Sequence, residues 1–352
     1  MAKPTIANVA KLAGVSQATV SRALRGATNV TEETRIKVQR AADQLNFTLS
    51  KSASALASGK TMRVILLVSG KLNEWFNSGV LQGVYEELAP VGYDVTPAFI
   101  TDRSELDRFF SQLPKSRNSD AIIISSFQLM PAMHDKLQAI DLPTVGVNVP
   151  AESGYFDASI SIDNSSAMTM AVRLLRSLGH TNIAFCSDYI PTDMVYNTSQ
   201  RTKAFADAAQ ANAADGVTFS MLTADAHDVP LSKSDLASQL TAKLLSLPER
   251  PTAVCVETDQ VAIALVKELR KQQLNVPEDI SVLGFDDAEI AQAADLSTIR
   301  QEPIELGRIA GRKVLQLLHN EPLEHPHELQ DPLLVLRNTT SRIDTGAASA
   351  VE

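Results

Sequence analysis

The chain of 352 residues is too long for one compact domain, and its length predicts two or three. Its 44% of hydrophobic residues is typical of soluble globular domains. The sequence contains no run of 18 apolar residues, so no membrane-spanning helix is expected. The first residues lack the apolar stretch of a secretory signal, and the only two cysteines, Cys186 and Cys255, lie inside apolar runs. We therefore expect a cytoplasmic protein with reduced, buried thiols and neither a disulfide nor a metal site.

The net charge of −9 is distributed unevenly along the chain. Residues 1–60 contain nine Lys/Arg and three acidic residues, a charge of +6, and the remainder carries −15. A basic segment attached to an acidic body indicates that this segment alone binds a polyanion. On charge alone, a solvated basic surface is an equally good interpretation.

The first 45 residues carry only helical signals. A first amphipathic helix ends at Gly14, Ser16 is a good N-cap for a second helix through Leu24, and Thr31 caps a third. In the third helix Ile36, together with Val38, Ala41 and Leu45, is expected on the buried face. Three short helices at this spacing predict a helix-turn-helix unit.

Residues 46–61 are polar and rich in Ser and Ala, which is typical of a linker. A short helix is an alternative, because Ala53, Leu56 and Ala57 would share one face.

From Met62 onward, apolar strand-like runs alternate with amphipathic helical stretches. Repeated βα units imply parallel sheets with helices on both faces, and there are too many strands for one small sheet. The fold class expected for the whole chain is an all-α helix-turn-helix head followed by an α/β sensor domain with two doubly wound lobes and a cleft at the carboxyl ends of the strands. The expected strands are 64–68, 94–100, 121–125, 144–149, 160–162, 183–186, 217–222, 252–256 and 280–285, and the expected helices are 77–89, 104–112, 131–139, 165–178, 200–213, 232–246 and 259–272.

These patterns give the expected domain boundaries. They are 1–46 for the helix-turn-helix head, 47–61 for a hinge linker or hinge helix, 62–342 for the two-lobed domain, and 343–352 for a flexible tail. Within the large domain, the N-lobe is expected at about 62–163 and 297–326, and the C-lobe at about 164–296 and 327–342.

Residues 5–24, TIANVAKLAGVSQATVSRAL, closely resemble the DNA-binding head of the LacI/GalR family of bacterial repressors, with Asn8 in place of the usual Asp. The resemblance continues in order along nearly the whole chain, through Gly179-His180, the run 276–287 and Thr298-Ile299-Arg300-Gln301. One departure lies in the hinge, where Phe47-Thr48-Leu49-Ser50 stands in place of the family's usual Tyr-x-Pro-Asn. The large domain, like that of the family, resembles periplasmic sugar-binding proteins.

The residues of the head suit base and phosphate recognition. In the major groove Gln17 pairs well with adenine and Arg22 with guanine, while the small Ala18 leaves room for a thymine methyl group. Leu56 matches the family's apolar lever in the minor groove, with packing against a partner's hinge as the alternative. For the polar residues the alternative is a helix cap or a solvated surface. The expected DNA-binding residues are Thr5, Ser16, Gln17, Ala18, Thr19, Ser21, Arg22, Asn29, Thr34 and Leu56.

The resemblance also implies an effector site between the two lobes, lined by residues at successive strand ends. Taken singly, each of these residues is an ordinary loop polar group or, for the aromatic pair, the cap of a helix entrance. Together they favour a polyhydroxylated ligand, in which Arg201 could grip a carboxylate, a phosphate or vicinal hydroxyls. The expected effector-binding residues are Trp75, Phe76, Asn148, Asn197, Arg201, Thr258, Asp286 and Gln301.

The resulting expectation is a transcriptional regulator that acts as a repressor. It is expected to bind a near-palindromic DNA operator as a homodimer and to respond to a sugar or sugar derivative. A nucleobase or another metabolite acting as corepressor is the alternative effector, and a sugar-binding protein of a transporter is a remote alternative function. No catalytic residue, cofactor or metal is expected, because the chain contains no G-x-x-x-x-G-K-[ST], G-x-G-x-x-G, H-E-x-x-H or G-x-S-x-G motif.

Overall fold

The computed structural model describes residues 4–24, 29–47, 60–116, 118–149, 154–189, 195–225 and 232–343. The chain divides into two compact units, residues 1–62 with 118–120 and residues 63–117 with 121–352. None of the helices in the described ranges is long and apolar enough to cross a membrane.

The first unit contains three short helices, α1 (Ile6–Ala13), α2 (Gln17–Leu24) and α3 (Glu32–Gln44). Gly14 ends α1 with a positive φ of 67°, a conformation that glycine adopts without steric cost. The Ser16 Oγ accepts a hydrogen bond from the Thr19 N–H at 3.1 Å, and the Thr31 Oγ1 accepts one from the Thr34 N–H at 3.4 Å. The expected helix boundaries of the head are therefore confirmed, and α2 and α3 each begin at a capping side chain.

A small apolar core joins the three helices. It is built on Val9 and Val20 from α1 and α2, with Val38 and Ala41 from α3. The expectation that Ile36 faces this core is wrong, because its side chain is 44% exposed. Two residues along an α-helix correspond to a rotation of about 200°, so Ile36 lies on the side opposite Val38.

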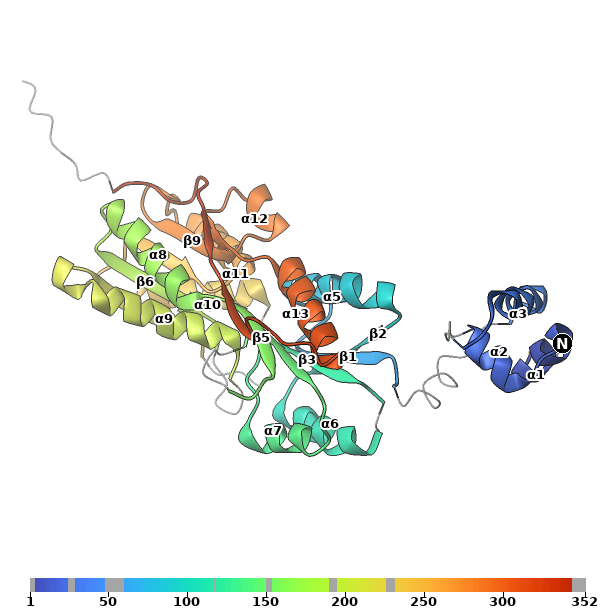
Figure 1. Cartoon of the computed structure of the whole chain (residues 1–352). Helices are drawn as coiled ribbons and strands as arrows, with labels where there is room; N and C mark the ends of the chain where they lie inside the picture. Colours follow the sequence, from blue (N-terminus) through green and yellow to red (C-terminus); the bar gives the residue numbers. More distant parts are fainter. Residues whose placement is uncertain are drawn as a thin grey trace, which may run out of the picture. The chain divides into compact units, whose positions relative to one another are not determined.

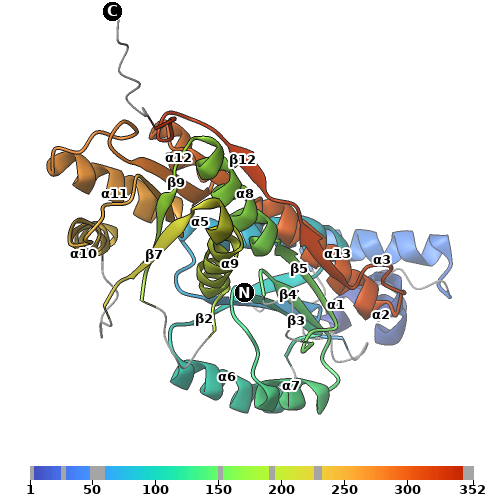
Figure 2. The ribbon, with the colours of Figure 1, turned by 90° about the vertical axis from the view of Figure 1, so that its left-hand side faces the viewer.

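The second unit consists of two α/β lobes, seen from two directions in Figures 1 and 2. The N-lobe sheet has the order β11-β5-β4-β3-β1-β2, and all its strands are parallel. Helices α5 and α13 cover one face, and α6 and α7 cover the other (Figure 2). The bounds are β1 (Arg63–Ser69), α5 (Trp75–Leu88), η1 (Ala89–Val91), β2 (Asp94–Ile100), α6 (Arg103–Ser116), β3 (Ala121–Ser125), α7 (Pro131–Gln138), β4 (Thr144–Val147), β5 (Ala158–Ile162), α13 (Pro303–Leu318) and β11 (His327–Gln330).

The C-lobe sheet has the order β12-β10-β9-β8-β6-β7, in which only the β10–β12 pair is antiparallel. Successive side chains of one strand enter opposite cores: Phe185 packs beneath α8 and α9, whereas Cys186 packs beneath α10 and α11. The bounds are α8 (Asn164–Ser177), β6 (Asn182–Ser187), α9 (Asn197–Ala211), η3 (Ala213–Asp215), β7 (Thr218–Thr223), α10 (Lys233–Leu245), β8 (Ala253–Val256), α11 (Asp259–Lys271), β9 (Ser281–Asp286), α12 (Glu289–Ala293), β10 (Thr298–Arg300) and β12 (Leu333–Val335).

The two cysteines lie on neighbouring strands of this C-lobe sheet. Cys186 and Cys255 are both buried and free, as expected, and burial raises the pKa of both thiols, that of Cys255 to about 12. Both thiols are therefore protonated and unreactive at neutral pH.

The sheets shift the expected lobe boundaries. Residues 298–300 form β10 of the C-lobe sheet rather than part of the N-lobe, and residues 327–330 form β11 of the N-lobe sheet rather than part of the C-lobe. The chain thus passes between the sheets three times, after β5, β10 and β11. The Asp163 N–H donates to the Gln330 carbonyl at 3.0 Å and so ties the first crossing to the third.

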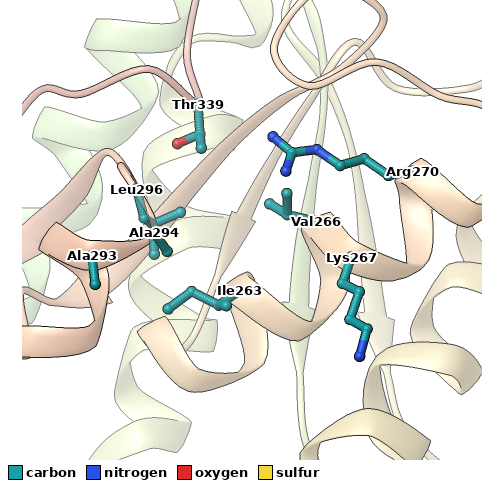
Figure 3. Close-up of a pocket in the computed structure, with 8 residues that line it drawn as sticks. All are labelled: Ile263, Val266, Lys267, Arg270, Ala293, Ala294, Leu296 and Thr339. Atoms are coloured by element: carbon teal, nitrogen blue, oxygen red, sulfur yellow. The ribbon is translucent and has the colours of Figure 1, made fainter.

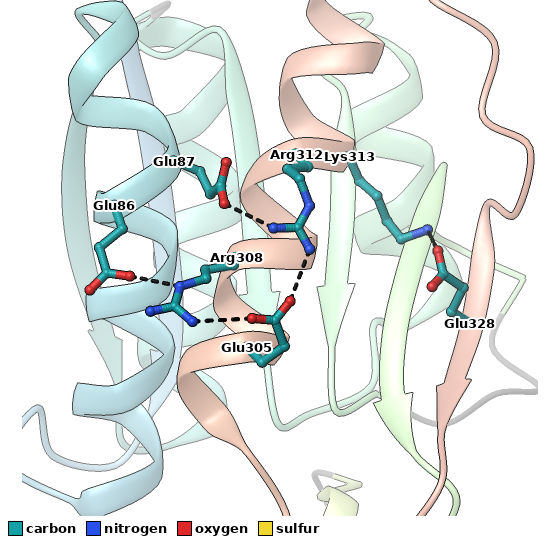
Figure 4. Close-up of polar contacts among 7 residues, drawn as sticks. All are labelled: Glu86, Glu87, Glu305, Arg308, Arg312, Lys313 and Glu328. Atoms are coloured by element: carbon teal, nitrogen blue, oxygen red, sulfur yellow. Dashed lines mark hydrogen bonds and ion pairs between the residues drawn. The ribbon is translucent and has the colours of Figure 1, made fainter.

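Helices α5 and α13 are in contact along most of their length. A Cβ atom added at Gly83 would lie 1.9 Å from the Ile304 carbonyl oxygen, and one at Gly307 would lie 2.4 Å from the Val80 carbonyl oxygen. Only glycine therefore permits this close backbone approach. At the surface of the seam, Arg308 binds Glu86 and Arg312 binds Glu87, and both arginines also bind Glu305 (Figure 4). The last helix of the N-lobe is thereby fastened to the first.

Candidate functional site

The exposed side chains of α2 form the candidate DNA-reading surface of the head. Gln17, Ala18 and Arg22 are exposed, and Ser21 is half-buried beside them. Ser16 and Thr19 at the start of α2 hydrogen-bond each other at 2.9 Å, in addition to the backbone cap at Ser16. The helix-cap interpretation of Ser16 is therefore confirmed, while Gln17 and Arg22 extend free of the small core.

The residues predicted to contact phosphates lie at helix starts. Thr5 precedes α1 and Thr34 lies in the first turn of α3, while Asn29 is exposed before α3. The hydrogen bonds of Asn8 explain why Asn can stand here in place of the family's usual Asp. Its Oδ1 accepts hydrogen bonds from the Thr5 N–H at 2.9 Å and from the Thr5 Oγ1–H at 2.6 Å. An amide oxygen at this position thus completes the N-terminal cap as a carboxylate would.

The predicted hinge falls almost entirely outside the described residues. Phe47 is described, but Thr48–Ser50 and Leu56 are not. The predicted role of Leu56 stays a prediction.

In the second unit, a chain of buried and partly buried hydrogen bonds joins the two lobes. The Asn148 Nδ2 at the end of β4 donates to the Gln301 Oε1 at 2.8 Å, and the Gln301 Nε2 donates to the Asp286 Oδ1 at 2.7 Å. Asn148 is 1% exposed and Gln301 is 4% exposed. The Asn148 Oδ1 also accepts from the Ile162 N–H at 2.9 Å. One amide side chain, Gln301, therefore bridges a strand end of the N-lobe and a strand end of the C-lobe.

Arg201 on α9 extends this chain into the C-lobe. Its Nη1 donates to the Glu257 carbonyl oxygen at 2.6 Å and lies 3.4 Å from the Asp286 Oδ1. The guanidinium carbon is 3.7 Å from the centroid of the Phe285 ring, a cation–π contact. Arg201 is 3% exposed, so its charge is held by an acid, a carbonyl and an aromatic face rather than by water.

Asn197 and Thr258 border the same region. The Asn164 Nδ2 at the start of α8 donates to the Asn197 Oδ1 at 3.0 Å. Several buried polar atoms here have no hydrogen-bond partner within the described chain: the Asn164 Oδ1, the Arg201 Nε and the Thr258 Oγ1. Because buried polar groups are rarely left unpaired, such atoms mark a place where a ligand or water completes the hydrogen bonding.

Trp75 and Phe76 are separate from this network. They begin α5, are half-buried and lie with their ring centroids 6.4 Å apart. Neither makes a polar contact with the network in the described structure, so their predicted role in the site stays a prediction.

The backbone at two of the strand ends is strained. Asn148 has a φ of 47° and Asp286 a φ of 124°, values that side-chain-bearing residues rarely adopt. Such strain is retained where the surrounding contacts fix the residue, and it is common at ligand sites.

Two polar residues of this region were missed by the sequence analysis: Asn164 and Glu257. Asn164 lies at the start of a helix that follows a strand, a position that the helical pattern alone does not distinguish. Glu257 is a charged residue directly after the apolar run 253–256, a signal that could have identified it. It is 6% exposed, and its Oε1 accepts a hydrogen bond from the Asp188 N–H at 2.8 Å.

The buried acids of the C-lobe have raised pKa values. Burial raises the pKa of Glu257 to about 7, with the Asp188 N–H and the cations Lys233 and Arg201 opposing the shift. Burial also raises the pKa of Asp286, against the attraction of Arg201 and the Gln301 hydrogen bond. Raised pKa values at converging strand ends are typical of functional sites.

Comparison with known proteins assigns the family. The pattern described as "Bacterial regulatory proteins, lacI family" matches residues 5–50, and that of a "Periplasmic binding protein-like domain" matches residues 172–340. The HTH-type transcriptional repressor PurR of Vibrio campbellii is 30% identical over 345 residues, 97% of this chain and 99% of that protein. The chain belongs to the lacI family. It is therefore a DNA-binding transcriptional regulator rather than an enzyme, as the sequence predicted.

Other members of the lacI family match over nearly the whole chain. The ribose operon repressor of Haemophilus influenzae is 27% identical over 344 residues, 95% of this chain and 98% of that protein. The crystal structure of the lac repressor dimer bound to operator and the anti-inducer ONPF superposes with a TM-score of 0.81 at 23% identity, covering 97% of this chain and 100% of that chain. This structural match confirms the expected head and two-lobed fold.

The Glu257 carboxyl gives this lacI-family protein a pH-dependent stability. Because its pKa is about 7 in the folded protein and 4.5 ordinarily, its stabilising contribution is full below about pH 4.5 and is lost as the pH rises through 7. Between pH 5 and pH 8 the wild type should therefore lose about 2 kcal/mol more unfolding free energy than Glu257→Gln. Urea unfolding of both proteins at the two pH values measures this difference. The control Glu289→Gln, which changes an exposed acid of the same lobe, should follow the wild type, and an equal pH dependence in Glu257→Gln would contradict the assignment.

Proposed function

We propose that this regulator is a repressor that binds its operator as a homodimer in the cytoplasm and is controlled by a small, hydroxyl-rich effector bound between the lobes. The observation that carries the proposal is the buried chain from Asn148 through Gln301 and Asp286 to Arg201. These groups come from both lobes and from the crossing between them, and their neighbours include unpaired polar atoms. A ligand with several hydroxyl groups can both donate to Asp286 and accept from Arg201.

In this proposal the effector acts by changing the arrangement of the lobes. Asn148, Gln301 and Asp286 satisfy one another without a ligand, so an effector that binds them must replace contacts between the lobes. Replacing these contacts favours one lobe arrangement over another, and only such a difference in affinity can shift operator binding. The linker enters the N-lobe at β1. In this proposal a change in the arrangement of the lobes is therefore transmitted to the paired heads through the chain segment that precedes β1.

A sugar or sugar derivative is the effector class that we favour. The related ribose operon repressor carries the name of a sugar, and the polar strand ends of this chain suit hydroxyl groups. A nucleobase is the alternative, because the half-buried Trp75 at the start of α5 offers a flat apolar surface on which a base could stack.

Self-association would use a hollow on the C-lobe that is lined by both apolar and basic side chains. This hollow of about 360 Å³ lies between α11 and the segment that follows α12, and Figure 3 shows its lining side chains. Ile290 on α12 is 50% exposed, and on the N-lobe Tyr85 and Phe99 are 59% and 41% exposed. Exposed apolar groups on both lobes suit a two-fold contact with a second copy. The lining residues are Ile263, Val266, Lys267, Arg270, Ala293, Ala294, Leu296 and Thr339.

Arg22→Ala should abolish sequence-specific operator binding. A bidentate arginine–guanine contact contributes about 1–3 kcal/mol per half-site, so a dimer that loses two contacts should bind about 30-fold to 10⁴-fold more weakly. The operator is first selected from random DNA with the wild-type protein, and affinities are then measured by gel shift. The control Arg40→Ala removes an exposed arginine from α3 and should retain specificity. Wild-type affinity of Arg22→Ala for the operator would contradict the proposed recognition surface. Binding of one chain per operator in the same titration would contradict the proposed dimer.

Arg201→Ala and Asp286→Ala should separate effector sensing from DNA binding. An effector is first identified by thermal shift with a panel of free sugars and nucleobases, and its affinity is measured by calorimetry. Both variants should bind the operator but lose affinity for the effector. An inducer would then no longer release them from the operator, and a corepressor would no longer raise their affinity for it. The control Lys203→Ala changes an exposed lysine of the same helix and should behave as the wild type. Wild-type effector affinity in both variants would remove these residues from the site.

A further inference from the structure

The C-lobe side of the effector site contains more buried negative charge than positive charge. Arg201 is a buried cation there, and its guanidinium already contacts Asp286 and the Glu257 carbonyl. Glu257 and Asp286 are acids on the ends of neighbouring strands, and Asp188 follows β6 beside them. The exposed Lys233 at the start of α10 attracts both Glu257 and Asp286 from the surface.

Asp286 and Glu257 differ in how their charge is balanced. Asp286 accepts hydrogen bonds from Gln301 and pairs with Arg201. The Glu257 carboxyl accepts the Asp188 backbone N–H and has no salt bridge within the described residues. Its charge is therefore available to a ligand in the site, as a hydrogen-bond acceptor for a donor group and as a repulsive charge for an anion.

The Nε of Arg201 is the donor that an anionic ligand would need. It is buried and has no acceptor within the described chain. An anion bound there would face two carboxylates at the ends of the C-lobe strands: that of Asp286, whose Oδ1 is 3.4 Å from the Arg201 Nη1, and that of Glu257, which accepts from the Asp188 N–H just beyond β6. In a buried site this like-charge repulsion is poorly screened, so it opposes binding of the anion strongly.

We propose that Glu257 is a specificity-determining residue of the effector site, which accepts a hydrogen bond from a hydroxyl or amino group of an uncharged effector and excludes effectors that carry a phosphate or carboxylate. This inference rests on the proposed effector site and narrows it. Arg201 by itself could hold a hydroxyl, a phosphate or a carboxylate group of a ligand. With Glu257 beside it, the site accepts hydroxyl groups and excludes phosphate and carboxylate groups. The raised pKa of Glu257 agrees with a carboxyl whose charge is incompletely neutralised.

Inorganic phosphate is a probe that tests this proposal without knowledge of the effector. Thermal unfolding of the full chain is measured at pH 8 with 0–50 mM phosphate, with chloride added to keep the ionic strength constant. The wild type should show no phosphate-dependent change in Tm. Glu257→Gln keeps the shape of the side chain but removes its charge, so phosphate should raise its Tm, with an apparent affinity at least about tenfold above that of the wild type.

Glu268→Gln is the matched control. Glu268 is also a buried acid of the C-lobe, 7% exposed, and lies on α11 ten residues beyond Thr258, which is about 15 Å along the helix. This variant should respond to phosphate as the wild type does. A response in Glu268→Gln equal to that in Glu257→Gln would show a general effect of lost charge and would overturn the proposal.

Two further outcomes decide the proposal independently of the repressor function. Phosphate that stabilises the wild type as strongly as Glu257→Gln overturns it, and so does the absence of any response in a Glu257→Gln protein that melts cooperatively. If Glu257→Gln does not fold, calorimetric titration of the wild type decides, since sub-millimolar phosphate binding would overturn the proposal and no binding would support it. Because the probe involves no DNA, these results stand apart from a failure of operator binding.

Discussion

The two hydrogen bonds of the Gln301 side chain are the constraint on which the two-lobed domain depends. The amide accepts from Asn148 at the end of an N-lobe strand and donates to Asp286 at the end of a C-lobe strand. The bond to Asn148 is buried and the bond to Asp286 is partly buried, and a broken buried hydrogen bond costs about 1–3 kcal/mol when its partner stays unsatisfied. A small displacement of one lobe against the other therefore needs a replacement partner for these groups, which a ligand can provide.

The other features of the site follow from this junction. Parallel strands bring Asn148 to the carboxyl edge of the N-lobe sheet, and Asp286 and Glu257 to the carboxyl edge of the C-lobe sheet. Helix α9 supplies the buried Arg201, which pairs with Asp286. The glycine seam between α5 and α13 fastens the helix after Gln301 to the first helix of the N-lobe.

The sequence predicted those elements whose determinants are local. Gly14, Ser16 and Thr31 fix the head helices by their own conformation or side chain, and apolar runs placed β1 to β9 within about two residues, whereas β10, β11 and β12 were not predicted as strands. The assignment of β10 and β11 to their sheets failed because it depends on pairing with distant strands, which no local pattern records. Asn148, Arg201, Asp286 and Gln301 were each named in advance, but their mutual hydrogen bonds and the burial of Glu257 arise only from tertiary packing.

Hydrogen exchange of Gln301→Ala, compared with the wild type, tests most directly whether this side chain joins the lobes. The Ile162 amide is held by Asn148 in the N-lobe, and the Ala288 amide, two residues after Asp286 in the C-lobe, is held by the Asp259 carboxylate. If Gln301 couples the two strand ends, its removal should accelerate exchange about 5-fold to 100-fold in peptides covering both amides. Acceleration confined to the residues next to position 301, with both peptides exchanging as in the wild type, would contradict the account.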